Sequence, residues 1–448
     1  MITPPGEGGI AALRLAGPAS LAILSRHFRP TQVKSPASPW LLRHGLFTDR
    51  EGASIDEVTA VYMPEGQSYT GLEQVEIFCH GGHLVVRQIL HELLTAGARA
   101  AEPGEFTRLA FLSGRIDLAR AEAVAEVIAA NTEVSLATAR NHLLGAYTER
   151  LEQMRQEIVA VMAEVEASID FPEEEIEPAM AAGQRESIDQ VRGKILQLAA
   201  TYRGGRIIRE GYRVTIGGRP NAGKSSLFNR LLRQERAIVA ATPGTTRDYL
   251  SEWIDLHGYA VNLVDTAGIR RGGGAVEQAG QTSARKIMEE ADLVVWLVDL
   301  SAKDWQKQLG EDLASIGGLP VVIGANKIDL VGAAPAISET PAEIETIYLS
   351  CKTGEGIDNL VGHLVAHINE GMPDFTSGMI VTSARHRQKL ETAETALRSA
   401  SEKISLKESP ELVAFDLRQA AGALEEITGR IYNEDILDQI FSKFCIGK

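Results

Sequence analysis

A glycine-rich stretch with one lysine and one serine is the first part of this sequence whose residue types and spacing can do chemistry. The segment Gly218-Arg-Pro-Asn-Ala-Gly-Lys-Ser225 fits the pattern G-x-x-x-x-G-K-[ST]. The apolar segment 212–216 precedes it and the helix-like segment 226–232 follows it, which is the context that this pattern needs. Backbone N–H groups of such a loop surround phosphates, Lys224 reaches the β and γ oxygens, and Ser225 holds Mg²⁺. The sequence therefore predicts a site for a nucleoside triphosphate.

Two later motifs have the positions that contact with the γ-phosphate requires. Thr246 is the second threonine after Gly244, and we expect it to complete the Mg²⁺ shell and to sense the γ-phosphate. Asp265 ends the apolar segment 260–264, where an aspartate bonds a magnesium-bound water, and Gly268 can donate its N–H to the γ-phosphate. These spacings predict a nucleotide-dependent switch.

A third pair of motifs predicts which base is bound. Asn326-Lys-Ile-Asp329 follows the apolar segment 321–323, and the Asp329 carboxylate can accept two hydrogen bonds from the N1 and N2 groups of guanine. Adenine lacks that pair of donors, so the nucleotide is expected to be GTP and not ATP. Ser350-Cys-Lys352 comes after the strand-like segment 347–349 and is expected to close the base pocket. The residues predicted to contact GTP are Asn221, Ala222, Gly223, Lys224, Ser225, Ser226, Ala240, Ala241, Thr242, Pro243, Gly244, Thr245, Thr246, Asp265, Thr266, Ala267, Gly268, Asn326, Lys327, Asp329, Ser350, Cys351 and Lys352.

The residues beside these motifs indicate how hydrolysis is catalysed. Ras-like GTPases carry a water-orienting glutamine directly after the switch glycine, whereas Ile269 stands there in this chain and can do no polar chemistry. The nearest downstream carboxylate is Glu277, beyond the loop 270–274. The amide oxygen of Asn221 can ligate a monovalent cation where an arginine finger would otherwise place positive charge. The alternative is that Glu277 and Asn221 are both solvated loop residues.

Composition limits the class of protein. A chain of 448 residues is too long for one core, so two to four domains are expected. The net charge of −15 argues against a broad basic face that binds nucleic acid. Three widely spaced cysteines favour a reducing, cytoplasmic location. Apolar stretches are no longer than a strand and no secretory signal is evident, so no membrane contact is expected.

Periodicity predicts a multidomain organisation with an insertion. Residues 1–113 mix strands, turns and one helix and predict an α+β domain. Residues 114–207 are helical, with Leu118, Ala121, Ala125 and Ile128 on one face. Residues 208–372 hold the nucleotide motifs and predict an α/β P-loop domain of the Ras-like kind. Helical periodicity resumes over 373–448, so the GTPase domain is expected to be inserted into an all-α domain.

Two side-chain groups allow alternative interpretations. Two basic clusters flank the nucleotide domain and are either local RNA contacts or solvated surface and hinge: Arg203, Arg206, Arg209 and Arg213, and then Arg385, His386, Arg387 and Lys389. Cys79-His80-Gly-Gly-His83 carries metal-capable side chains. It supplies only three donors with no distant matching pair, so a tight turn before a helix is the preferred interpretation.

Several segments together resemble one known family. These are the nucleotide motifs with Gly244-Thr-Thr-Arg-Asp248, the start Thr3-Pro-Pro-Gly-Glu-Gly-Gly9, the segment 103–118 and the end Cys445-Ile-Gly-Lys448. With the inserted arrangement, they resemble the MnmE (TrmE) family of tRNA modification GTPases over essentially the whole chain. The resemblance implies a dimer joined through the N-terminal domains and a flavoprotein partner, MnmG (GidA), which alone carries FAD, in a heterotetramer or larger complex.

The same resemblance implies a reaction, modification of the C5 position of the wobble uridine of certain tRNAs to an aminomethyl or carboxymethylaminomethyl uridine. The one-carbon unit comes from 5-formyl- or methylene-tetrahydrofolate bound in the N-terminal domain. Carried over position by position, the folate residues are Arg14, Glu76, Arg115 and Lys448. Cys445 is implied in the modification chemistry or its site.

For the nucleotide site, the resemblance implies cations and a catalytic water. K⁺ is held by Asn221 with Ala240, Thr242 and Thr245 of the first switch, and Mg²⁺ by Ser225 and Thr246. Glu277 orients the attacking water through a second water, beside Lys224 and Thr246 as catalytic groups. Hydrolysis is activated when two nucleotide domains dimerise across their switch faces.

Two departures from the family and two alternatives remain open. The family usually has several more residues before Thr3, and Arg115 stands where relatives often have lysine, which is not equivalent at a bidentate site. One alternative is a ribosome-assembly or signalling switch like Era and EngA, and the other is a scaffold that binds GTP without hydrolysis. Cys445, Arg14 and Glu76 favour the modification enzyme, since a pure switch has no reason to carry them.

Overall fold

The computed structural model describes residues 1–4, 6–31, 38–170, 178–237, 250–266, 285–316, 318–331, 344–370, 372, 379–445 and 447. The chain divides into two compact units. Unit 1 contains Met1–Ile128, Asn141–Gly193 and Lys389–Lys448, and unit 2 contains Ala129–Arg140 and Lys194–Gln388. Within the described ranges, no helix has the length and apolar character needed to cross a bilayer.

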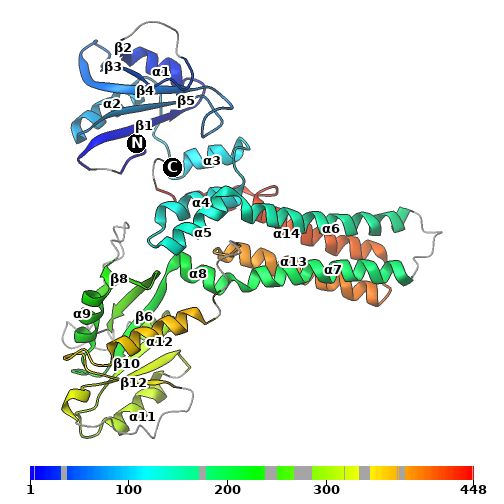
Figure 1. Cartoon of the computed structure of the whole chain (residues 1–448). Helices are drawn as coiled ribbons and strands as arrows, with labels where there is room; N and C mark the ends of the chain where they lie inside the picture. The colour runs from blue at the N-terminus through cyan, green and yellow to red at the C-terminus, as the bar shows by residue number, and fades with distance from the viewer. Residues whose placement is uncertain are drawn as a thin grey trace. The chain divides into compact units, whose positions relative to one another are not determined.

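Unit 1 begins with a five-stranded antiparallel sheet (Figure 1). Its strands are β1 (Gly8–Ala16), β2 (Phe28–Pro30), β3 (Arg43–Thr48), β4 (Ser54–Met63) and β5 (Gln74–Gly81), in the order β1-β5-β4-β3-β2. Apolar side chains alternate along the strands, so one face forms a core with α1 (Ser20–His27) and α2 (His83–Thr95). The register of β1 and β5 places Arg14 opposite Glu76, which positions two predicted site residues side by side.

The rest of unit 1 is helical. Its helices are α3 (Glu105–Leu112), α4 (Leu118–Ala129), α6 (Ala146–Asp170), α14 (Pro410–Thr428) and α15 (Glu434–Phe441), while α5 (Glu133–Leu144), α7 (Pro178–Ala200) and α13 (Ala384–Ser405) each run from one unit into the other. Helices α6 and α14 lie side by side (Figure 1). Arg155 on α6 pairs with Glu425 on α14 at 3.2 Å. Segments before and after unit 2 therefore pack together, as expected of an inserted domain, whereas the boundaries at 113, 207 and 372 stay predictions.

The predicted apolar face of α4 is buried over most of its length. On α4, Leu118 and Ala121 are fully buried and Ala125 is partly buried, but Ile128 is 45% exposed. Phe111 and α15 pack only on the first turns of α4, which leaves the last position of this face exposed. Helix α8 (Tyr202–Glu210) contains Gly204 and Gly205.

Unit 2 is built on a seven-stranded sheet (Figure 1). Its strands are β6 (Tyr212–Gly218), β7 (Arg236–Ala237), β8 (Leu250–Leu256), β9 (Tyr259–Asp265), β10 (Leu293–Asp299), β11 (Val321–Asn326) and β12 (Thr346–Leu349), in the order β12-β11-β10-β6-β9-β8-β7. The first five in this order are parallel, β8 is antiparallel to β9, and β7 is antiparallel to β8. The fold class predicted from the sequence is confirmed: an α+β domain, an all-α domain and an inserted α/β P-loop domain.

The parallel strands place the nucleotide motifs at one edge. The phosphate loop follows β6, Asp265 ends β9, Asn326 ends β11, and Ser350 follows β12. Parallel strands end at the same edge of a sheet, where open α/β folds bind their ligands. Helices α9 (Lys224–Gln234), α11 (Trp305–Ile316) and α12 (Ile357–Asn369) accompany the sheet. Four motifs far apart in sequence are therefore gathered at one edge.

Candidate functional site

The phosphate loop has a backbone that only certain residues adopt. Gly218, Asn221 and Gly223 have φ of 133°, 63° and 105°, in the region that favours glycine and tolerates asparagine. A Cβ on Gly223 would lie 2.2 Å from Nδ2 of Asn326. The glycine therefore lets the loop approach the base-recognition motif, and α9 begins directly after it with N–H groups suited to phosphate.

The reactive side chains of the loop are already in place. Lys224 is 8% exposed, and its Nζ donates to the carbonyl oxygens of Gly218 and Arg219, both at 2.9 Å. Ser225 Oγ donates to Oδ2 of Asp265, which is fully buried, at 2.9 Å. A hydroxyl beside a carboxylate at a helix N-terminus is a donor set that suits Mg²⁺, which takes one or two protein oxygens and completes its shell with phosphates and water.

The base-recognition motifs form a bonded network. Asn326 is 2% exposed; its Nδ2 donates to the Ala222 carbonyl at 2.7 Å and its Oδ1 accepts from the Cys351 N–H at 3.0 Å. Ser350 Oγ donates to Oδ1 of Asp329 at 2.6 Å. Burial raises the pKa of the Cys351 thiol to about 11, so the thiol stays neutral. The carboxylate of Asp329 is therefore oriented before a base arrives.

The lysine of the base motif, Lys327, is held by an aspartate at the end of the neighbouring strand β10. Lys327 has φ of 71°, and its Nζ pairs with Oδ2 of Asp299 at 2.6 Å. Burial alone would raise the pKa of Asp299, but hydrogen bonds from Lys327 and Ser301 outweigh it and hold that pKa below its ordinary value. The Lys327 side chain is thus fixed at the edge where the base is expected.

Part of the predicted nucleotide site lies outside the described residues. These predictions remain untested by the geometry: Ala240, Ala241, Thr242, Pro243, Gly244, Thr245, Thr246, Ala267, Gly268, Ile269 and Glu277. Thr266 is described, and its Oγ1 donates to the Ile216 carbonyl at 2.9 Å. The described residues therefore include those predicted to contact phosphate and base, and all of these contacts stay predictions.

A second cluster lies on the N-terminal sheet. Arg14 Nε donates to Oε1 of Glu76 at 2.9 Å, and Gln74 donates to the same oxygen at 3.1 Å. The Arg14 guanidinium lies over the rings of Tyr69 and Phe106, at 5.2 Å and 5.4 Å. A carboxylate, a planar cation and two aromatic rings together suit a flat heterocycle with amino and carbonyl groups, such as a pterin.

The other two residues predicted to bind folate are Arg115 and Lys448. Arg115 Nη1 donates to the carbonyl of Gly66 at 3.1 Å, which starts the loop that carries Tyr69. Gly447 has φ of 97°, and a Cβ there would lie 2.1 Å from the Met1 carbonyl oxygen. Cys445 is exposed, and Lys448 is not described.

The N-terminal residues connect the C-terminal tail to the strand of Arg14. The N–H of Ile2 donates to the Ala12 carbonyl on β1 at 2.8 Å, and Gly447 packs against Met1 and Ile2. Arg14 follows Ala12 by two residues on the same strand, so both side chains point to one face. The tail with Cys445 therefore reaches the sheet that holds the Arg14 cluster.

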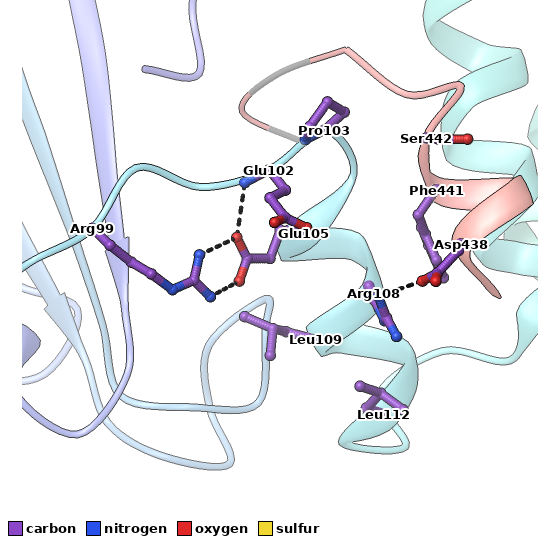
Figure 2. Close-up of a pocket in the computed structure, with 10 residues that line it drawn as sticks. All are labelled: Arg99, Glu102, Pro103, Glu105, Arg108, Leu109, Leu112, Asp438, Phe441 and Ser442. Atoms are coloured by element: carbon purple, nitrogen blue, oxygen red, sulfur yellow. Dashed lines mark hydrogen bonds and ion pairs between the residues drawn. The ribbon is translucent and has the colours of Figure 1, made fainter. Parts of the chain in front are cut away.

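A cavity between α3 and α15 was missed by sequence reasoning (Figure 2). It holds about 510 Å³ and is lined by Arg99, Glu102, Pro103, Glu105, Arg108, Leu109, Leu112, Asp438, Phe441 and Ser442. Hydrogen bonds from Arg99 lower the pKa of Glu105, and Arg108 binds Asp438 at 2.9 Å. Because its two walls come from helices over three hundred residues apart, no local pattern signals it. It lies beside the segment that leads to Cys445.

The ambiguous side-chain groups have structural partners. Four cations of the two basic clusters are engaged within their own units: Arg206 with Asp292, Arg213 with Glu290, Arg387 over the ring of Tyr202, and Lys389 with Glu426. These contacts favour a structural role for the four.

The metal-capable segment is also accounted for. Cys79 is buried, with its Sγ 3.6 Å from the Ala11 carbonyl, and His80 bonds Asp56 at 2.8 Å. That bond raises the pKa of His80. Across the described ranges, no three His, Cys, Asp or Glu side chains are grouped to hold a metal. The turn before α2 is therefore the better interpretation.

The chain matches two family models and many known proteins. The models are the GTP-binding protein TrmE N-terminus, over residues 1–115, and the MnmE helical domain, over residues 118–445. The tRNA modification GTPase MnmE of Akkermansia muciniphila is 40% identical over 447 residues, which cover 100% of this chain and 97% of that one. The protein of the same name from Symbiobacterium thermophilum is 41% identical over 456 residues, covering 100% and 98%.

Among solved structures, the chain is similar to a point variant of Era from Aquifex aeolicus bound to GDP.AlF4-. The TM-score is 0.29 at 26% identity, and the match covers 41% of this chain and 66% of that one.

We predict that Lys224→Ala abolishes nucleotide binding. The buried ammonium loses its place beside the phosphates, so GDP affinity should fall by about 100-fold or more, measured by titration with a fluorescent GDP analogue. Lys307→Ala, which removes an exposed lysine on α11, should leave affinity within about twofold of the parent. Unaltered affinity in Lys224→Ala would refute the site.

Proposed function

We propose a specific reaction for this chain, which belongs to the MnmE (TrmE) family of tRNA modification GTPases. It hydrolyses GTP in a K⁺-dependent way and, with the flavoprotein MnmG (GidA), modifies C5 of the wobble uridine of certain tRNAs in the cytoplasm. The one-carbon unit comes from 5-formyl- or methylene-tetrahydrofolate, and FAD belongs to the partner. The active form is a homodimer within a heterotetramer or larger complex. The single observation that carries the proposal is the presence in one chain of the GTP-binding edge of unit 2 and the Arg14 cluster of unit 1.

Binding of GTP follows from the described side chains. The N–H groups at the start of α9 and the Lys224 ammonium neutralise the β- and γ-phosphates. Asp329 accepts hydrogen bonds from the guanine N1 and N2 groups, held in place by Ser350. Ser225, Thr246 and, through water, Asp265 would hold Mg²⁺, which when bound neutralises charge on the transferred phosphoryl group.

Hydrolysis requires a positioned water and positive charge. Water attacks the γ-phosphorus as the bond to the β-phosphate oxygen breaks, and charge grows on the β-phosphate. Asn221 offers its amide oxygen, with Ala240, Thr242 and Thr245, to K⁺, which when bound supplies the charge of an arginine finger. Glu277 orients the water through a second water. Hydrolysis is activated when two nucleotide domains meet across their switch faces.

The N-terminal cluster would bind the folate. Glu76 accepts from the amino and N–H groups of a pterin, while Arg14, Tyr69 and Phe106 bound its flat face. Arg115 and Lys448 are cations available to the acidic tail of the ligand. Contact of Gly447 with Met1 and Ile2 keeps the Cys445 thiol near this sheet. The thiol can then act at the modification site.

We expect GTP hydrolysis to be at least about tenfold faster in K⁺ than in Na⁺ at equal ionic strength. Asn221→Ala should remove the difference, because the amide oxygen that ligates K⁺ is lost. The measurement is phosphate release at saturating GTP. Equal rates of the parent protein in the two salts would remove the role assigned to Asn221.

Mass spectrometry of tRNA nucleosides tests the reaction itself. Cells lacking this protein should lose an aminomethyl-type wobble uridine. The intact chain should restore it, and Cys445→Ser should not, since the thiol is missing. Cys79→Ala, a change at a buried cysteine, serves as the matched control and should restore it. An unchanged nucleoside profile in the deleted cells would contradict the proposal and favour a ribosome-assembly switch.

A further inference from the structure

Helix α9 carries an arginine that bonds the base-recognition loop. Arg230 Nη2 donates to the Thr353 carbonyl at 2.8 Å, and Nη1 donates to the Lys352 carbonyl at 3.4 Å. Gly354 has φ of 97°, and a Cβ there would lie 2.0 Å from Nη2 of Arg230. The glycine therefore permits the close approach of the guanidinium. The contact is specific to arginine, because one planar group reaches two successive carbonyls.

Most backbone N–H groups of the loop 350–354, which Arg230 bonds, already donate to acceptors within the protein. The N–H of Ser350 donates to Glu355, that of Cys351 to Asn326, and those of Thr353 and Gly354 to Ser350. In the part of the chain that the structure describes, the N–H of Lys352 has no acceptor. Since the loop borders the base site, the N–H group of Lys352 is what it offers to a carbonyl oxygen of the base.

The orientation of the Lys352 N–H depends on how the backbone around it is held. Arg230 fixes the carbonyls of Lys352 and Thr353, which restricts the backbone dihedrals between them. The same loop holds the Asp329 carboxylate through Ser350. Helix α9 starts at the phosphate-binding Lys224 and reaches the base loop six residues later. One rigid helix thus spans phosphate and base recognition.

We infer that Arg230 is a positioning residue for guanine recognition: by bonding the carbonyls of Lys352 and Thr353 it orients the N–H of Lys352 toward the O6 atom of the base. It acts through the loop that it bonds. The Arg230 Nε is buried without a hydrogen-bond acceptor among the described residues. The two bonds that its Nη atoms make both go to this loop. The inference depends on the guanine site and not on the tRNA reaction.

The test compares two nucleotides that differ at one atom. GDP has an oxygen acceptor at position 6 of the base, whereas 6-thio-GDP has sulfur, a weaker acceptor. The N1 and N2 groups that Asp329 is proposed to bind are the same in both. A site built around a hydrogen bond rejects an analogue that cannot make it. Arg230→Ala should weaken GDP binding by about 5- to 20-fold and 6-thio-GDP binding by less, so discrimination between the two falls at least about threefold.

Further probes separate positioning from a general loss of structure. IDP lacks the N2 amino group that Asp329 recognises, so the GDP/IDP ratio should stay within about twofold of the parent in Arg230→Ala. Arg230→Lys should retain part of the O6 discrimination, because an ammonium can reach one carbonyl. Arg233→Ala is the matched control, since Arg233 lines the same cavity of about 360 Å³ beside α9. Among the residues that the structure describes, no hydrogen bond joins Arg233 to the loop. This variant should leave all three affinities within about twofold.

Two results would overturn the inference. Equal weakening of GDP and 6-thio-GDP in Arg230→Ala would mean that the arginine only stabilises the domain. Unchanged affinities would mean that the loop needs no support. If the alanine variant fails to fold by circular dichroism, the lysine variant decides the question through the same ratio. Because tRNA is absent from these titrations, their outcome is independent of the modification reaction.

Discussion

The nucleotide site depends on one buried amide. Asn326 joins the phosphate loop to the base loop through Ala222 and Cys351, with both hydrogen bonds made away from solvent. An unmade bond at either end would leave a buried polar group unpaired, which costs about 1–3 kcal/mol. The amide reaches both loops because β11 ends beside β12 at the edge where the phosphate loop follows β6, and because Gly223 has no side chain. Phosphate and base recognition are therefore one structural unit.

In unit 1, the residues of the Arg14 cluster are brought together by a different constraint. The antiparallel register of β1 and β5 sets Arg14 opposite Glu76, and two aromatic rings enclose the guanidinium. The C-terminal tail adds a segment from the other end of the chain, held by a glycine that fits against Met1. A strand register and a close backbone approach thus bring together residues more than four hundred positions apart. In the proposed function, GTP chemistry belongs to unit 2 and folate chemistry to unit 1.

Sequence patterns gave the parts of this structure that are locally encoded. The apolar segments 212–216, 260–264 and 321–323 are confirmed as parts of β6, β9 and β11, since short apolar runs that precede motif residues are typical of buried parallel strands. The edge that collects the motifs follows from that topology. The hydrogen bonds of Arg230 to the base loop and the cavity between α3 and α15 could not be predicted from the sequence. They depend on side chains that meet only after long-range packing.

The most direct test of this account is GDP affinity in Asn326→Ala, measured by isothermal titration. Loss of both bridging bonds should separate the two loops and weaken binding by roughly 100-fold. Asn359→Ala, at an exposed position on α12, should bind as the parent does. Affinity of Asn326→Ala within about twofold of the parent would contradict the claim that one amide unites phosphate and base recognition.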